Sequence, residues 1–424
     1  ITVVALASAP WVARHLSLPP GVDRVLLPGL CAGDLAPLAA QLGVPVERGP
    51  KDLRDLPEFF GRRAGPPQGY GAYDIAILAE INHAPRLPRA ELLARARAYR
   101  DAGADVIDVG CDPGETWTGT GDAVRALRAE GMRVSIDSFD AAEVEAAVAA
   151  GAELVLSVNR GNREQARAVY ERHGGAFVVV PDVVATLEGL DETVAALAGW
   201  GVPFRIDPVL EPVGFGLAAS LGRYLEVRRR YPDAEMMMGV GNLTELTETD
   251  SAAINLLLLG FCQEQGIRSV LTTEVINWCR SCVRELDVAR RLVYHACRER
   301  VLPKHLTSDL VLLRDRRLRA HGEEALRELA AQIKDRNFRL FAERGLLHVL
   351  NDKLFLQGTD PFALFRQMQE RENIDPAHAF YLGYEMAKAV TALTLGKNYV
   401  QDQALRWGFL TREEGADCQG PGSP

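Results

Sequence analysis

Short apolar runs alternate with longer amphipathic stretches from about residue 74 to residue 300. The runs are rich in aliphatic and β-branched residues, as buried strands are. They are YDIAILAE (73–80), ADVIDVG (104–110), RVSID (133–137), ELVLSVN (153–159), AFVVV (176–180), PFRID (203–207), EMMMGV (235–240) and SVLTT (269–273). The stretches between them, such as PRAELLARARAYRDAGA (88–104), have helical periodicity. Eight such units predict an α/β fold in which a parallel sheet closes into a (β/α)8 TIM barrel.

The regions on either side of this repeat have other patterns. Residues 1–72 alternate apolar runs with short helical stretches and predict a small N-terminal α/β domain, and GRRAGPPQGYG (61–71) has the composition of a linker. Residues 301–412 predict a mixed, mainly helical C-terminal extension, with short strands in FRLFAERGLLHVLNDKLFLQG (338–358). The tail 413–424 is expected to be disordered. The barrel domain is therefore expected at 73–300.

Composition and charge exclude several classes of protein. The chain has 424 residues, of which 47% are hydrophobic and 25% charged, as is typical of soluble globular proteins. A net charge of -9 argues against nucleic acid as the main partner. No run of about 18 consecutive apolar residues occurs, so no membrane span is expected. The seven cysteines are scattered, which favours reduced thiols and a cytoplasmic location.

Polar side chains end almost every predicted strand. Because the carboxyl ends of barrel strands meet at the mouth where such barrels have their active sites, we expect these side chains to share one site. They are Glu80, Asn82, Asp108, Asp112, Asp137, Ser138, Ser157, Asn159, Asp182, Asp207, Asn242, Thr273 and Glu274. A single aspartate could instead cap the next helix, as Asp140 is expected to do with Glu143. Recurrence at eight strand ends favours a ligand.

The residue types at these ends favour a ligand that carries N–H donors. The histidines are dispersed and only His83 follows a predicted strand closely, so a histidine-rich zinc or iron site is not expected. A hard cation bound by oxygens stays open. A carboxylate accepts two parallel hydrogen bonds from an amidine-like edge, and pterins carry that edge. GFGLAA (214–219) matches GxGxxA, but a dinucleotide site is not expected without the βαβ context and the following acidic residue.

Several motifs resemble those of the pterin-binding barrels, the superfamily of dihydropteroate synthases and pterin-dependent methyltransferases. They are GADVIDVG (103–110), VSIDS (134–138), AGAELVLSVN (150–159) and RIDP (205–208) with GFG (214–216). The stretches VERGPKDLRDLP (46–57) and GKNYVQDQALRWG (396–408) resemble dihydropteroate synthase-like proteins of tetrahydromethanopterin biosynthesis. The resemblance implies that Asp137 and Asp207 hold the pterin ring. The remaining polar contacts would come from Asn82, Asp108, Ser157, Asn159 and Asn242.

The same resemblance implies a transferase. It would join a hydroxymethyl-dihydropterin diphosphate to an arylamine in the synthesis of a tetrahydromethanopterin- or folate-type cofactor. His83, Arg86 and Arg160 are the candidates for binding the diphosphate, and Asn242 and Asp108 are the catalytic candidates. Mg²⁺ on the diphosphate and a homodimer are both compatible with the sequence. Asp108 is expected to contact the ligand, and Asp112 to shape or close the mobile loop CDPGETW (111–117).

Two departures from the synthase pattern leave the reaction open. EINHAPR (80–86) stands where synthases have roughly Asn-x-Thr-Pro-Asp-Ser, and GVGNLTEL (239–246) stands where they have Ser-Arg-Lys. Asn242 and Leu243 therefore occupy the place of a basic residue. An asparagine here is typical of the methyltransferase branch, where it addresses N5 of the pterin. The alternatives are methyl transfer from a methyl-tetrahydropterin to a corrinoid or another acceptor, and a non-catalytic pterin-binding subunit.

Overall fold

The computed structural model describes residues 8–50, 56–61, 69–304, 306–307, 309–311, 313–315 and 318–414. The chain divides into two compact units, Ile1–Tyr70 with Pro303–Thr307, and Gly71–Leu302 with Ser308–Pro424. Three expectations fall wholly or partly outside the described residues: the first apolar run of the domain expected at 1–72, the linker 61–71 and the disordered tail 413–424.

The first unit has short alternating elements. They are α1 (Ala9–His15), β1 (Val25–Leu27), α2 (Ala36–Leu42), β2 (Val46–Arg48) and α3 (Leu56–Phe59). Strands β1 and β2 pair in parallel, with Val25 opposite Val46. Their apolar side chains pack with α1 and α2 around Ala9, Val12 and Leu38, so this part has its own small core.

Eight parallel strands form the barrel, which confirms the fold class predicted from the apolar runs. They are β3 (Ala76–Ile81), β4 (Val106–Gly110), β5 (Arg133–Asp137), β6 (Leu154–Val158), β7 (Ala176–Val179), β8 (Phe204–Ile206), β9 (Met237–Gly239) and β10 (Ser269–Thr272). Their order is β8-β7-β6-β5-β4-β3-β10-β9. Between β8 and β9 a single parallel bridge joins Ile206 to Met236, and the Ile206 amide donates to the Glu235 carbonyl at 2.9 Å.

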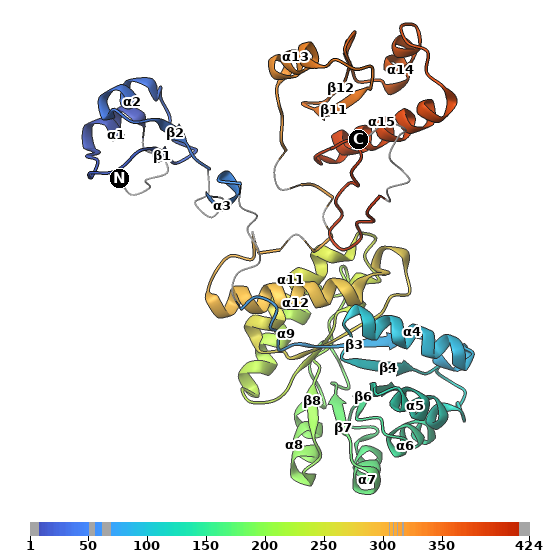
Figure 1. Cartoon of the computed structure of the whole chain (residues 1–424). Coiled ribbons are helices and arrows are strands. Elements are labelled where there is room, and N and C mark those ends of the chain that lie inside the picture. Colours follow the sequence, from blue (N-terminus) through green and yellow to red (C-terminus); the bar gives the residue numbers. More distant parts are fainter. Residues whose placement is uncertain are drawn as a thin grey trace. The chain divides into compact units, whose positions relative to one another are not determined.

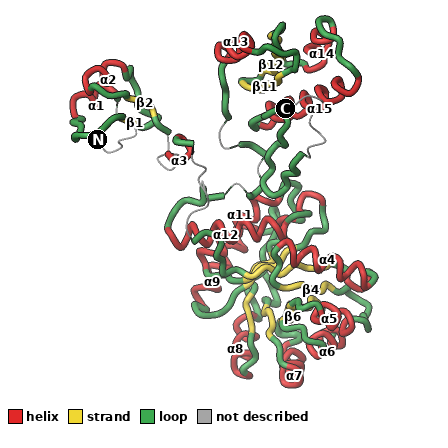
Figure 2. Tube along the Cα trace, in the orientation of Figure 1, coloured by secondary structure: helices red, strands yellow, loops and turns green. Residues whose placement is uncertain are grey.

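Helices surround these strands (Figure 1, Figure 2). The main ones are α4 (Arg89–Ala102), α5 (Thr120–Ala129), α6 (Ala141–Ala149), α7 (Arg163–His173), α8 (Leu190–Trp200), α9 (Leu217–Arg230), α11 (Ser251–Gln265) and α12 (Cys282–Glu299). Short turns of helix occur at η3 (Ala84–Arg86), α10 (Gly241–Thr244) and η4 (Asn277–Cys279). The large core of the barrel lies between strands and helices and includes Ile77, Val109 and Ile136.

The alternation of side chains along each strand decides what reaches the barrel mouth. On β3 and β4, Leu78 and Val106 belong to a separate cluster inside the barrel, whereas Ile77 and Ile107 pack toward the helices. Two residues further along each strand, Glu80 and Asp108 therefore face the interior. Glu80 lies opposite Asp108 in the register.

The C-terminal part has a second core. Its elements are α13 (Glu323–Gln332), β11 (Arg339–Glu343), β12 (Leu346–Leu350), β13 (Phe355–Gly358), α14 (Pro361–Gln369) and α15 (Pro376–Leu395). The three strands form an antiparallel sheet, and a turn at Asn351 and Asp352 joins β12 to β13. Leu340, Val349 and Met386 are among the residues of this core.

The motif GKNYVQDQALRWG has structural contacts in this part. Lys397 is 3% exposed and pairs with Asp315 at 3.3 Å, and the Tyr399 hydroxyl donates to Glu385 on α15 at 2.6 Å.

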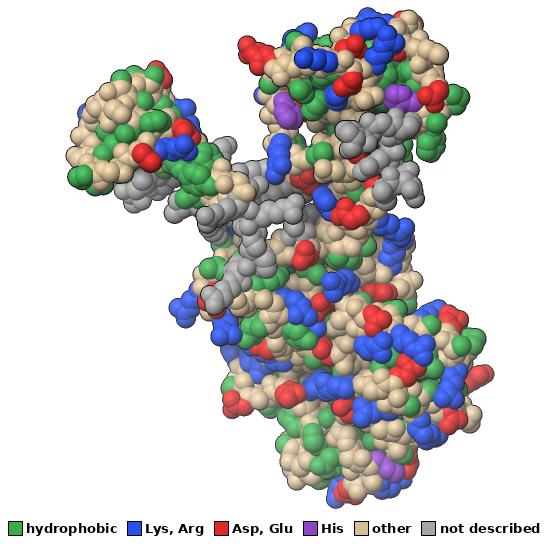
Figure 3. All heavy atoms as spheres, viewed as in Figure 1, with side chains coloured by type: hydrophobic (Ala, Val, Ile, Leu, Met, Phe, Trp, Pro, Cys, Tyr) green, Lys and Arg blue, Asp and Glu red, His purple; other side chains and the backbone are tan. Residues whose placement is uncertain are grey.

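Basic and acidic side chains are interspersed on the face of the barrel drawn in Figure 3. Within the described residues, no helix combines the length and apolarity needed to cross a bilayer.

Candidate functional site

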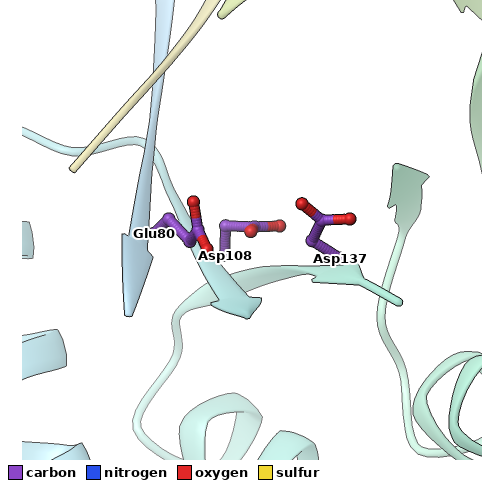
Figure 4. Close-up of side chains that lie close together, drawn as sticks. All are labelled: Glu80, Asp108 and Asp137. Atoms are coloured by element: carbon purple, nitrogen blue, oxygen red, sulfur yellow. The ribbon is translucent and has the colours of Figure 1, made fainter. Parts of the chain in front are cut away.

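Three carboxylates meet at the carboxyl ends of β3, β4 and β5. Glu80, Asp108 and Asp137 each contribute a carboxylate oxygen to a group whose atoms all lie within 4.8 Å of one another (Figure 4). Asp108 is fully buried. We call these three residues the acidic floor. Asp108 faces the interior of the barrel, in the strand register expected from the sequence.

Burial and mutual repulsion favour the protonated forms of the acidic floor. Burial, followed by the charges of Asp137 and Glu245, raises the pKa of Glu80 to about 8. Burial, followed by the charges of Glu80 and Asp137, raises the pKa of Asp108 well above its usual value. The Ser135 hydroxyl donates to Asp108 Oδ1 at 2.5 Å and partly offsets this shift. Burial also raises the pKa of Asp137.

Asp207 follows β8 and is held by several donors. The Tyr224 hydroxyl on α9 donates to Asp207 Oδ1 at 2.6 Å, and the Val209 amide donates to the same oxygen at 2.8 Å. Burial raises the pKa of Asp207 to about 6, although these donors and the Gly239 amide favour the ionised form. Asp207 is therefore fixed in position and ionised above about pH 6.

Helix capping does not explain these strand-end aspartates. Helix α5 begins after Gly119 and α9 begins after Gly216, so neither Asp108 nor Asp207 is an N-cap. Asp140 is the N-cap of α6 and accepts from the Ala142 and Glu143 amides, as expected. Asp108 and Asp207 therefore remain available to contact a ligand.

His83 and Arg86, two of the candidates for the diphosphate, already hold a carboxylate. Arg86 Nε and Nη2 donate to the two oxygens of Asp112 at 2.8 and 2.9 Å, and His83 Nδ1 lies 2.5 Å from Asp112 Oδ1. The Arg86 and His83 hydrogen bonds hold the pKa of Asp112 below its usual value. The side chains of His83 and Arg86 are 59% and 66% exposed, so solvent reaches this cluster.

Arg160, the third candidate, is paired elsewhere on the mouth. Its Nε donates to Asp182 Oδ2 at 2.7 Å, and its Nη2 donates to Glu188 at 3.3 Å. The structure therefore brings His83 and Arg86 together but places Arg160 in a separate ion pair with residues that follow β7.

The polar residues expected to complete the pterin contacts have varied surroundings. The Asn82 side-chain amide donates to Glu80 at 3.1 Å, and its Oδ1 is buried without a hydrogen-bond partner. Ser157 lies in an irregular part of β6 with a φ of 71°. Asn159 Oδ1 accepts from the Gly161 amide within its own loop at 2.8 Å. Asn242 is exposed, and its Nδ2 donates to the Leu210 carbonyl at 2.9 Å, across the junction of β8 and β9.

The loop 111–117 is fastened at both ends, which differs from the freely moving loop expected from the sequence. Asp112 is held by His83 and Arg86. At the other end, the Thr116 hydroxyl donates to Asp140 and the Trp117 amide donates to Glu143, both at 2.6 Å. Sequence reasoning did not foresee these contacts because their partners lie 24 to 29 positions away along the chain.

Exposed apolar side chains line the loops around the mouth. Phe139 follows β5, Phe215 follows β8 and Val275 follows β10, and their exposed fractions are 67%, 79% and 49%. Loops after barrel strands surround the active site in this fold. The mouth therefore combines an acidic interior with an apolar rim.

Three residues of the site were not among the expected ones. Glu80 was expected at the mouth as a strand-end carboxylate, without a role of its own, and it lies near the end of β3 on the same inward face as Leu78. Ser135 precedes Asp137 by two positions and shares its face. Tyr224, which holds Asp207, lies on α9, and Glu245, whose charge raises the pKa of Glu80, follows α10. Neither residue had a signal from strand alternation.

Three parts of the chain match known families. Residues 86–195 match a family described as pterin binding enzyme. Residues 1–51 match a family of unknown function, DUF6513, and residues 328–402 match the family PterinBD-DUF4346. An uncharacterized protein of Methanocaldococcus jannaschii is 28% identical over 371 residues, which are 78% of this chain and 69% of that protein.

Solved structures of dihydropteroate synthases match about half of this chain at low similarity. One from Yersinia pestis, with a pterine-sulfa conjugate, has 18% identity and a TM-score of 0.42 and covers 53% of this chain and 95% of its own. One from Thermus thermophilus, with 4-aminobenzoate, has 23% identity and a TM-score of 0.39 and covers 52% and 93%. The family match at 86–195 spans β4 to β7 and includes Asp108 and Asp137. The chain thus carries a (β/α)8 barrel, and the part of it from residue 86 to residue 195 matches the pterin binding enzymes.

Proposed function

We propose that the barrel binds a reduced pterin in its mouth and joins it to an arylamine in a dihydropteroate synthase-like condensation. One observation carries the proposal: an acceptor-rich interior adjoins an arginine and a histidine that already bind a carboxylate. Asp137 and Asp207 offer carboxylate oxygens to the N–H groups of the amidine-like pterin edge. Asn82 adds a buried oxygen that has no other partner.

His83 and Arg86 would bind the diphosphate leaving group. A phosphate presents oxygens to an arginine fork much as a carboxylate does. In our proposal the diphosphate replaces Asp112 on these donors, which frees the first residues of the loop 111–117. Charge that develops on the departing pyrophosphate would then be stabilised at the rim, away from the acidic floor.

The apolar rim would orient the arylamine. Phe139 and Phe215 are exposed on loops after β5 and β8, and an aromatic ring would bury part of their surface. Positioning the amine nitrogen against the pterin methylene carbon supplies much of the rate in such a condensation. The bond that forms joins this carbon to nitrogen, and the bond that breaks joins the carbon to the diphosphate oxygen.

Pyrophosphate release tests this function. The full chain would be supplied with hydroxymethyl-dihydropterin diphosphate and 4-aminobenzoate as a probe amine. We expect amine-dependent release of pyrophosphate, with Arg86→Ala losing turnover. Asp137→Ala and Asp207→Ala should each weaken pterin binding by about 2 to 5 kcal/mol. Unchanged pterin affinity in both aspartate variants would rule out the pterin site.

Asn242 favours a second candidate, methyl transfer. A neutral amide, rather than a lysine, follows β9 at the mouth, and a neutral donor suits interaction with N5 of a methyl-tetrahydropterin. Release of the methyl group to reduced cobalamin would identify this reaction, and Asn242→Ala should then impair turnover more than binding. Tight pterin binding without either turnover would identify a non-catalytic pterin-binding subunit.

A further inference from the structure

We propose that the acidic floor binds a hard divalent cation of the Mg²⁺ or Mn²⁺ class. Glu80, Asp108 and Asp137 come from three neighbouring strands, and Figure 4 shows their carboxylates turned toward a common space. One oxygen from each lies within 4.8 Å of the others, so all three can approach a single ion. This site goes beyond the proposed function, and it shares Asp137 and Asn82 with the pterin contacts proposed there.

Asp108 supplies an independent sign that a partner belongs there. It is fully buried, and its Oδ2 has no hydrogen-bond partner. The Ser135 hydroxyl donates to Oδ1 and so fixes the orientation of the Asp108 carboxylate, while Oδ2 accepts no hydrogen bond. Buried polar atoms are nearly always paired, and a metal ion supplies the missing partner for a carboxylate oxygen. A hydrogen bond that orients a ligand in this way is a usual feature of metal sites.

Asn82 adds a second buried oxygen that accepts no hydrogen bond. Its Oδ1 is buried without a partner, while its Nδ2 is committed to Glu80. Among the described residues, no lysine, arginine or histidine forms an ion pair with any member of the acidic floor. Carboxylate and amide oxygens without nitrogen or sulfur are the ligands of Mg²⁺, Mn²⁺ and Ca²⁺, whereas zinc sites use histidine and cysteine.

Gly110 keeps the space for Glu80 open. A Cβ at this position would lie 2.4 Å from Glu80 Oε1, closer than non-bonded atoms approach. The glycine therefore lets the Glu80 carboxylate lie against β4 beside Asp108. Gly110→Ala would push this carboxylate away without changing any oxygen ligand.

Titration calorimetry of the full chain with MgCl₂ or MnCl₂ alone tests the site. We expect one saturable site per chain, with affinity at least tenfold weaker in Glu80→Gln, Asp108→Asn and Gly110→Ala. Glu115→Gln, which changes an exposed carboxylate of the mouth, is the matched control and should bind as the wild type does. The spectrum of bound Mn²⁺ would confirm an environment of oxygen ligands.

Two outcomes would overturn the proposal. One is the absence of saturable binding of either ion, which would leave the floor as carboxyl groups that share protons. The other is equal affinity in the wild type and Glu80→Gln. Glu80 is partly exposed, so this variant should fold even if Asp108→Asn does not, and circular dichroism checks that it does. Because the probes are ions alone, the result does not depend on whether a pterin binds.

Discussion

Asp207 is the residue at which burial and hydrogen bonding compete most clearly. Its raised pKa of about 6 makes its protonation depend on pH in the range where proteins are studied. Protonation removes the negative charge that a pterin N–H would meet. The contribution of Asp207 to pterin affinity should therefore be constant above about pH 7 and fall about tenfold per pH unit below pH 6.

Calorimetry with a reduced pterin between about pH 5 and 8 checks this dependence. Asp207→Asn should bind more weakly and lose the part of the profile that belongs to this carboxylate. A wild-type affinity that does not change over this range would contradict the role of Asp207 as an acceptor.

Tyr224 controls the same carboxylate from α9. Its hydroxyl favours ionised Asp207, so Tyr224→Phe should raise the Asp207 pKa further and move the fall in pterin affinity to higher pH. The free energy of unfolding should decrease by about 1.5 to 3 kcal/mol at pH 8, where Asp207 is ionised. The loss should shrink as the pH falls through the Asp207 pKa. Tyr231→Phe, which removes a bond to exposed Asp191, is the control and should leave the pH profile unchanged.

At the scale of elements, the loop 111–117 depends on one carboxylate for its first attachment. Asp112→Asn weakens the pairing with Arg86 and His83, so the loop should open more often. We expect turnover to change while pterin affinity changes little, since Asp112 lies outside the acidic floor. Single-turnover kinetics and pterin titration measure the two effects separately. Asp122→Asn on α5 is the control, and a large loss of affinity in Asp112→Asn would place this residue in the pterin site.

Helix α12 is tied to the opposite end of the barrel by a buried arginine. Arg290 is 1% exposed, pairs with Asp287 at 2.8 Å and Asp105 at 2.5 Å, and stacks on Tyr73. Arg290→Met should cost about 3 to 5 kcal/mol of unfolding free energy, because it leaves buried charge without its partner. Denaturant unfolding measures this loss. Arg284→Met removes an exposed guanidinium that lies 3.4 Å from Asp287, a carboxylate that still has Arg290 and Arg291 as partners, and should cost less than about 1 kcal/mol.

The elements that the sequence predicts best are those with a local signal. The eight strands follow from apolar runs, and the inward positions of Glu80 and Asp108 follow from alternation along β3 and β4. The bond from Tyr224 to Asp207 spans 17 positions, and the one from Arg290 to Asp105 spans 185. Such contacts depend on how the strands and helices pack, so neither periodicity nor motif reveals them. The pairing of His83 and Arg86 with Asp112 was hidden for the same reason.

At the scale of the whole molecule, the two largest hydrophobic cores are distinct, and a small cluster with Ala252, Val288 and Leu310 lies outside both. The barrel packs around Ile77 and its neighbours, and the C-terminal part packs around Leu340 and Met386. Separate cores predict separate unfolding transitions. Scanning calorimetry should resolve one transition for each, and a reduced pterin should raise only the barrel transition.

Lys397→Met tests the assignment of these transitions. It removes a 3% exposed charge that pairs with Asp315 and lies 4.5 Å from the centre of the Trp407 ring. The C-terminal transition should move to lower temperature while pterin affinity stays unchanged. Lys353→Met, at an exposed position in the same part, is the control. A loss of pterin binding in Lys397→Met would show that the two parts act as one.

A single bridge pairs β8 with β9, so this junction is the most weakly paired one in the barrel. Neighbouring strands elsewhere share at least three paired residues. Local opening of the barrel should therefore begin at this junction. Asp207 follows β8 there, and the Asn242 side-chain amide donates to the Leu210 carbonyl across it. A ligand that contacts both residues would link the two strands. A bound ligand would then slow the local opening of the barrel at this junction.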